Sequence, residues 1–200
     1  GVHRPQPGAA RETARPETGA GVVEMTKEGV NRIYMLGLAP APSGQSEDRY
    51  AAALGAQILG GGANSRLHWA LVEKGLAEEA QAAWDGHDGC GDYFVFASSD
   101  PSRAEEVWDT IVDEAGKVAA SVVEDDLVKL RAKLATGATL SGERPGDRMQ
   151  RLGRTWMTRR EYLSLEDELA MIDRVTVADV KRVLEEFPVA PTTWGQLGPG

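Results

Sequence analysis

The sequence predicts a β-hairpin, and this feature constrains the fold more than any other. Strand-like stretches at residues 76–84 and 90–98 flank a Gly-His-Asp-Gly segment at 86–89, which has typical turn chemistry. A loop this short joins antiparallel neighbours, because parallel strands need a crossover of about a dozen residues or more. Helical patterns then cluster after the hairpin instead of alternating with strands. The chain is therefore predicted to be an α+β domain and not a doubly wound parallel sheet.

The order of the other elements follows from hydrophobic periodicity. Residues 30–38 are apolar on both faces, typical of a central strand, and Pro40 and Pro42 are expected to end it. Ser46 is expected to start a helix that the glycines at 60–62 end, and Asn64 to cap the next one. The remaining predictions are helices over 104–118, 123–134, 149–156, 165–172 and 176–184, the last opened by a Thr176–Asp179 capping pair, and a closing strand over 192–197.

Charge and composition exclude several function classes. The 22 Lys and Arg residues against 31 Asp and Glu give a net charge of -9, an average field that repels nucleic acid and anionic membranes. No apolar run approaches the roughly 18 residues that span a bilayer. We therefore expect a soluble protein, cytoplasmic or periplasmic, with no nucleic-acid partner and no membrane span. The dense basic run has helical spacing and is interpreted as a solvated helix face; it comprises Arg148, Arg151, Arg154, Arg159 and Arg160.

Residues that carry catalytic or metal-binding chemistry are sparse. Cys90 is the single cysteine, which excludes an internal disulfide and a cysteine-based zinc cluster. The histidines His3, His68 and His87 lack the spacing that places two imidazoles on one helix face. The glycines at 60–62 lack the Gly-Lys-Ser/Thr that ends a phosphate-binding loop, so they are interpreted as a structural turn. The residues alone therefore show no catalytic centre.

Three short motifs nevertheless stand close together. They are Leu-Gly-Gly-Gly at 59–62, Ser-Arg-Leu at 65–67 and Glu-Lys-Gly-Leu-Ala at 73–77. In this combination the segment 49–80 resembles the C-terminal, non-metal-binding half of the pitrilysin/insulinase (inverzincin) zinc metallopeptidases, of the mitochondrial-processing-peptidase type. The order of elements agrees with that family over 21–199, about nine tenths of the chain.

The resemblance implies a metallohydrolase-like half domain with an antiparallel-dominated sheet backed by helices. Residues 21–200 would form this insulinase-family peptidase-like domain, and residues 1–20 a linker or mobile arm from the preceding half. In the family, two such halves enclose a peptide-degrading chamber, and an N-terminal half binds zinc through His-x-x-Glu-His and a distant glutamate. No such motif occurs here. The chain alone is thus expected to hold no zinc and to be no enzyme, although the parent protein may be a zinc metallopeptidase.

Family members that are active present an arginine and, seven residues later, a tyrosine from this half to the substrate. Here the two positions fall on Val72 and Glu78, with one residue deleted between them. Valine has no side-chain donor, and glutamate places negative charge where an oxyanion would develop. The resemblance therefore implies a degenerate substrate-binding position.

The expected function is a non-catalytic half that helps to enclose a peptide-binding chamber with an N-terminal peptidase half or a partner subunit. The alternative is a non-catalytic paralogue that acts in assembly or peptide binding beside an active subunit. A third reading is an unrelated α+β interaction domain that shares only the glycine loop. A half without its neighbour should also expose an apolar patch and form a homodimer, with residues 76–98 and the helix of His68 and Trp69 at the edge of the patch.

Overall fold

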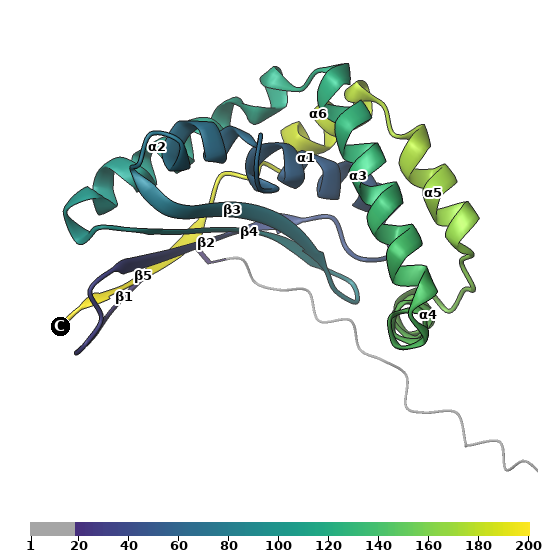
Figure 1. Cartoon of the computed structure of the whole chain (residues 1–200), viewed down its shortest axis with the longest axis horizontal. Helices are drawn as coiled ribbons and strands as arrows, with labels where there is room; N and C mark the ends of the chain where they lie inside the picture. Colours follow the sequence, from purple (N-terminus) through teal and green to yellow (C-terminus); the bar gives the residue numbers. More distant parts are fainter. Residues whose placement is uncertain (1–18) are drawn as a thin grey trace, which may run out of the picture.

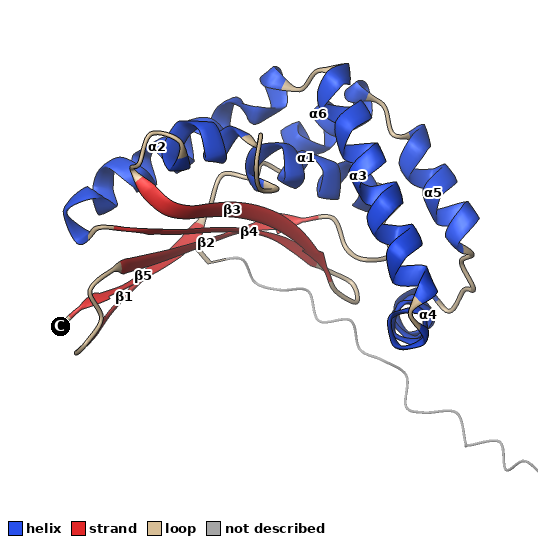
Figure 2. Cartoon of the chain, viewed as in Figure 1, coloured by secondary structure: helices blue, strands red, loops and turns tan. Residues whose placement is uncertain are grey.

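The computed structural model describes residues 19–200 and shows one five-stranded sheet with helices packed on one face (Figure 1, Figure 2). The order of strands across the sheet is β1-β5-β2-β4-β3. β1 runs parallel to β5, and the other pairings between these strands are antiparallel. The predicted α+β fold with an antiparallel-dominated sheet is confirmed. The strands are β1 (Gly21–Lys27), β2 (Ile33–Ala41), β3 (Ala77–Gly86), β4 (Gly91–Ser99) and β5 (Thr193–Pro199).

The described helices lie above a single face of the sheet, and α3, α4 and α5 extend beyond one end of it (Figure 1). The opposite face carries no helix from the described part of the chain. The helices are α1 (Arg49–Gly60), the π-helix η1 (His68–Val72), the 3₁₀ turn η2 (Pro101–Arg103), α2 (Ala104–Ser121), α3 (Glu124–Glu143), α4 (Pro145–Arg159), α5 (Leu165–Arg174) and α6 (Val177–Glu186). Of the predicted linker 1–20, residues 1–18 lie outside the described residues.

The predicted hairpin is confirmed as β3 and β4, and β2 is the central strand, as its two apolar faces indicated. The bounds predicted for β2 are wrong, because the strand continues through Pro40 to Ala41. Its pairing with β5 ends at Leu38, so Pro40 lies where β2 has only β4 beside it. Proline is tolerated in a strand segment that pairs with a neighbour on one side only. There its missing N–H need not remove a hydrogen bond from the sheet.

Strand β1 has no counterpart among the predicted strands. All its residues are exposed, so the sequence lacks the buried–exposed alternation that marks a strand. Two predicted helix caps are also wrong. The N-cap of α1 is Asp48, and the Ser46 Oγ instead accepts a hydrogen bond from the Asp48 N–H at 3.1 Å. Asn64 has a φ of 72°, and it is the Ser65 Oγ that accepts the His68 N–H at 3.3 Å.

The hydrophobic core lies between the sheet and the helices. Met35 of β2 and Tyr93 and Val95 of β4 are fully buried, as are Leu54 and Leu59 of α1, in one cluster. The apolar stripe predicted for α2 is buried in the same cluster, through Val107, Ile111, Ala115 and Val118. The hydrophobic effect thus holds α1 and α2 against the helix-covered face of the sheet.

The predicted capping pair opens α6. The Thr176 side chain accepts the Asp179 N–H, and the Asp179 carboxylate accepts the Thr176 N–H at 2.9 Å. The Thr176 hydroxyl also donates to this carboxylate at 2.6 Å, and this hydrogen bond, with that from the backbone, holds the pKa of Asp179 below its usual value. The cap fixes where α6 begins before the chain returns to the sheet as β5.

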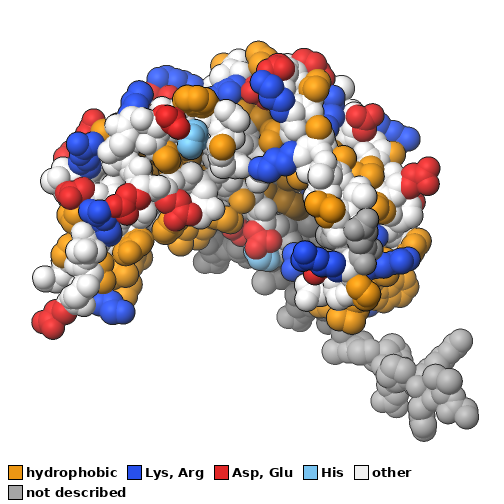
Figure 3. All heavy atoms as spheres, viewed as in Figure 1, with side chains coloured by type: hydrophobic (Ala, Val, Ile, Leu, Met, Phe, Trp, Pro, Cys, Tyr) orange, Lys and Arg blue, Asp and Glu red, His pale blue; other side chains and the backbone are white. Residues whose placement is uncertain are grey.

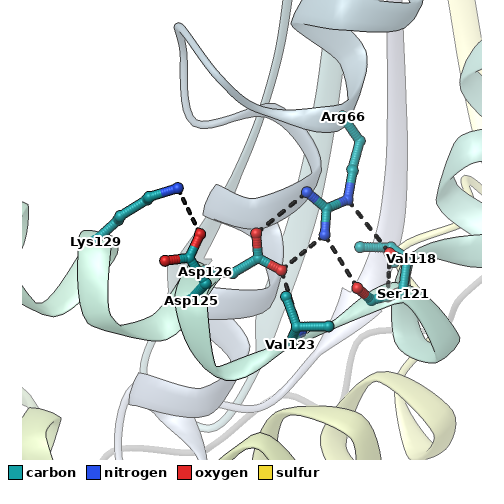
Figure 4. A network of polar contacts seen from close by, with 7 residues as sticks. All are labelled: Arg66, Val118, Ser121, Val123, Asp125, Asp126 and Lys129. Carbon is teal, nitrogen blue, oxygen red and sulfur yellow. Dashed lines mark hydrogen bonds and ion pairs between the residues drawn. The ribbon is translucent and has the colours of Figure 1, made fainter.

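A partly buried ion pair joins the Ser-Arg-Leu motif to the junction between α2 and α3 (Figure 4). The Arg66 guanidinium donates to both oxygens of Asp126, at 2.7 and 3.2 Å, and to the Ser121 carbonyl at 3.1 Å. The same carboxylate accepts the Val123 N–H at 3.2 Å. Bidentate geometry makes such a pair stronger than a point contact. Arg66 therefore fixes the turn between two helices from a loop some 55–60 residues earlier in the chain.

We predict that Asp126→Asn lowers the free energy of unfolding by about 1–2 kcal/mol, because it leaves a partly buried guanidinium without its countercharge. Asp125→Asn is the matched control. Asp125 pairs with Lys129 at the surface, and its loss removes the same charge from the first turn of α3. Chemical denaturation of both variants tests this. Equal midpoints for the two variants would contradict the role given to Asp126.

Candidate functional site

The glycines at 60–62, Val72 and Glu78 line one cavity of about 570 Å³ along the outer edge of β3. Segments distant in the sequence meet there, since α1 ends at one wall, η1 forms another and α3 supplies Lys133. We call this cavity the β3 groove. Its described lining is Gln57, Gly60, Gly61, Gly62, Ala63, His68, Val72, Lys133 and residues 78–83.

Gly60 brings the end of α1 into direct contact with β3. A Cβ atom at Gly60 would lie 2.1 Å from the Ala82 nitrogen and 2.7 Å from the Ala82 Cβ, so no larger residue fits without a shift. The left-handed conformation is at Gly62, with a φ of 100°, whereas Gly61 has a φ of -76°. A Cβ at Gly61 would lie 2.6 Å from the Gln57 carbonyl oxygen. In this turn, the conformational need for glycine is therefore at Gly62, and the steric need is at Gly60 and Gly61.

Val72 and Glu78 are both at the groove, yet neither offers it a hydrogen-bond donor. Val72 is half-buried at the end of η1, and Glu78 is exposed at a β-bulge near the start of β3. The Glu78 carboxylate forms an ion pair with Arg32, whose other terminal nitrogen lies 3.7 Å from Asp100. The charge of Glu78 is thus partly compensated by this chain's own arginine.

Polar groups are fixed at intervals along the groove. The Lys133 ammonium donates to the Gly61 carbonyl at 2.7 Å and to the Gln57 Oε1 at 3.3 Å. The His68 Nε2 lies 3.2 Å from a Glu73 carboxylate oxygen. Sequence reasoning missed Lys133, because nothing in its helical context relates it to a glycine turn some 70 residues earlier.

The groove adjoins an unpaired strand edge. Within residues 19–200, β3 hydrogen-bonds to β4 alone and ends the sheet. An edge strand presents backbone N–H and C=O groups that can pair with another extended segment. The arrangement can therefore hold an extended peptide beside β3.

A second surface lies on the face of the sheet that the described helices leave open. It contains an apolar cavity of about 380 Å³, and Met25, Leu36 and Val23 are 60%, 45% and 56% exposed there. Hydrophobic side chains gather at the lower left of Figure 3, where β1 and β5 lie in Figure 1. The main apolar lining of this open face is Val23, Met25, Tyr34, Leu36, Leu38, Phe96 and Leu197.

The open face differs from the patch expected from the sequence. Its centre is on β1, β5 and β2, and the hairpin contributes Phe96 of β4. Trp69 is 55% exposed, as expected of an aromatic off the buried stripe, but it does not line the open-face cavity. Sequence reasoning missed Val22, Val23 and Met25 of this face, because β1 was not predicted as a strand.

The described residues do not form a zinc site. Among the side chains that the structure describes in residues 19–200, which are all but those of residues 138 and 141–143, no group of three or more His, Cys, Asp or Glu is placed to hold a metal ion. His87 lies 3.1 Å from Asp92 and 3.8 Å from Asp85, and His68 has Glu73 as its partner. His3 lies outside the described residues. In the same part of the chain, no helix combines the length and apolar character needed to cross a membrane.

Comparison with known proteins places these features in a family. The family model described as "Peptidase M16 inactive domain" matches residues 3–134. An uncharacterized zinc protease of Streptomyces coelicolor is 31% identical over 196 residues, which cover 97% of this chain and 43% of that protein. This chain therefore spans less than half the length of that relative.

Solved structures share the fold. The peptidase M16 inactive domain structure from Pseudomonas fluorescens superposes with a TM-score of 0.84 at 19% identity, over 98% of this chain and 47% of that one. The inactive peptidase domain of a putative zinc protease from Bordetella parapertussis gives a TM-score of 0.71 at 17% identity, over 80% of this chain and 88% of that one.

We predict opposite stability effects for the same substitution at two helical glycines. Gly60→Ala should lower the free energy of unfolding by about 1–3 kcal/mol, because the new Cβ overlaps Ala82. Gly116→Ala in α2 meets nothing within 4 Å and should stabilise the chain by about 1 kcal/mol through helix propensity. Thermal unfolding of both variants tests this. An unchanged unfolding temperature in Gly60→Ala would contradict the close contact between Gly60 and Ala82.

Proposed function

The chain belongs to the family of peptidase M16 inactive domains, and on this premise we propose that it is the non-catalytic half of a longer zinc-protease-like protein, where it helps to enclose a peptide-binding chamber. Residues 21–200 would be the domain, and the first 20 residues the linker from the preceding half. The share of its relatives that the chain covers supports this proposal, because 57% of the Streptomyces protein lies outside the match.

Zinc would belong to the other half or to a partner subunit. The donor set of the described residues does not fit a zinc ion, which needs three protein ligands or more around one point. Val72 and Glu78 would also contribute no donor to a reacting carbonyl. The role left to this half is therefore to bind and confine the peptide.

The specific role that we propose is to hold an extended peptide segment in the β3 groove by strand addition. The single observation that carries this proposal is the 570 Å³ groove along an unpaired strand edge. Pairing to β3 would supply main-chain hydrogen bonds for affinity, and the flanking side chains would supply selectivity. Gly60 keeps α1 close to β3 and so forms the wall of the groove.

We expect the isolated chain to bind extended peptides and to lose this binding in Ala63→Trp, because the indole would fill the groove from its exposed rim. Fluorescence anisotropy with a labelled decapeptide library measures binding, and hydrogen exchange should show new protection of the amides at 78–83. Ala120→Trp, at an exposed site on α2, is the control and should bind like the unmodified chain. A library that fails to bind at millimolar concentration would overturn the proposal.

The open face is proposed as the surface that packs against the neighbouring half. Exposed apolar patches beyond a few hundred Å² are uncommon on monomeric proteins and mark interaction sites. The face is apolar across β1, β5 and β2 and carries no described helix.

The isolated chain should consequently self-associate through the open face as a two-fold dimer. Leu36→Lys should restore the monomer, because it places a charge in the centre of the patch. Val112→Lys, at a position of similar exposure on α2, should leave the dimer intact. Light scattering over a concentration series measures the mass. A monomer at several hundred micromolar in the unmodified chain would contradict the assignment.

The alternative, a paralogue that assists an active subunit, rests on Val72 and Glu78. Their side chains contribute no donor at the two positions where active members present arginine and tyrosine. The residues upstream of this chain distinguish the two proposals. A His-x-x-Glu-His motif there supports the enzyme half, and its absence supports the paralogue.

A further inference from the structure

The β3 groove carries opposite charges at its two ends. Glu78 and Glu79 lie near the start of β3, and Lys133 lies at the other end, where Gly61 follows the contact between Gly60 and Ala82. Ala82 follows Glu79 by three positions, which corresponds to about 10 Å along the strand and to opposite faces of it. An extended segment beside β3 would therefore meet a negative end on its open-face side and a positive end on its helix side.

The negative end retains charge that the chain does not compensate. Arg32 is shared between Glu78 and Asp100, so one guanidinium faces two carboxylates. Glu79 accepts a hydrogen bond from the neutral Gln81 side chain at 3.2 Å and has no cationic partner within the described residues. The Glu79 side chain is exposed and projects from the open face of the sheet, because β3 pairs Glu79 with Ser98 and Gln81 with Phe96, whereas Ala80 and Ala82 face the helices. A cationic group entering this end on that face would meet an exposed carboxylate.

The positive end is held in place but is also uncompensated. The Lys133 ammonium donates to two neutral oxygens, those of Gly61 and Gln57, and it forms no ion pair with any side chain that the structure describes. Its neighbour one turn earlier, Lys129, is instead paired with Asp125. Since an ammonium has three hydrogens, Lys133 keeps the capacity to donate to a carboxylate in the groove.

We infer that the groove selects extended peptides that are bipolar, with a cationic group beside Glu79 and a carboxylate beside Lys133, three residues apart and thus on opposite faces of the extended peptide. This inference rests on the proposed function, because it concerns the ligand of the same groove. Charge complementarity of this kind contributes more to selectivity than to total affinity.

Four labelled decapeptides of otherwise equal sequence test the inference by fluorescence anisotropy. Two carry Lys and Glu three residues apart, in either order, one carries two Lys and one carries two Glu at the same positions. One bipolar order should bind at least threefold more tightly than both like-charged peptides, and the preference should shrink between 0.05 and 0.5 M salt. Which bipolar order is preferred reports whether the peptide runs parallel or antiparallel to β3.

Variants assign the preference to the two ends. Glu79→Gln and Lys133→Gln should each remove most of the preference, whereas Lys129→Gln, one turn away on α3, should retain it. The double variant E79K/K133E should prefer the opposite bipolar order. Equal binding of the four peptides, or a preference unchanged in E79K/K133E, would overturn the inference and leave strand addition intact. Failure of every peptide to bind would overturn both.

Discussion

The close contact between the end of α1 and β3 is the constraint on which the rest of the structure depends. Helices usually pack on a sheet through side chains, but here Gly60 touches the backbone of Ala82. Small residues on both sides make this approach possible, since Ala80 and Ala82 are the buried residues of β3 beneath the helix. Because the helix ends at this contact, the chain must turn at once, which Gly62 permits with its positive φ. The wall of the groove is a direct result.

The same contact places the Ser-Arg-Leu motif at 65–67 directly after the turn, where each of its residues makes a different contact. Ser65 caps the segment after the turn, Arg66 reaches the α2–α3 junction and Leu67 is buried in the core. Three consecutive residues thus start the next helical segment, hold the junction between α2 and α3, and fill the core. Lys133 of α3 also contacts this turn. Its ammonium donates a hydrogen bond to the Gly61 carbonyl, which the turn exposes at the end of α1.

Much of the fold could be predicted from the sequence because local signals and burial agree in those elements. The hairpin, the α2 stripe and the Thr176 cap are of this kind. β1 could not be predicted, because both of its faces are exposed in this chain and its apolar residues fit no period. The bounds of β2 failed for a different reason. The strand can continue through Pro40 because its pairing with β5 ends at Leu38. Pairing between strands that are distant in the chain cannot be predicted from the local sequence.

The site shows the same division. The residues themselves predict the glycine turn and the resemblance proposes the positions Val72 and Glu78, whereas neither points to Lys133 or Arg32. Both missed residues act across long stretches of chain, Lys133 on Gly61 and Arg32 on Glu78. Their charges had no visible partner in the sequence, where isolated lysines and arginines are indistinguishable from solvated surface residues. Only the packing of α3 against α1 brings Lys133 to the groove, and only the fold brings Arg32 of the β1–β2 turn to Glu78.

Glu78, which we propose to stand where active family members have a tyrosine, illustrates how a peptidase-like half can lose chemistry without losing structure. The side chain is exposed at a bulge, so its charge stays hydrated and adds little desolvation cost. Arg32 provides a countercharge from the neighbouring turn. Neither change disturbs Gly60, the β3 edge or the buried residues beneath them. The features that would hold a peptide are thus physically independent of the features that would act on it, and a change at Val72 or Glu78 removes only the latter.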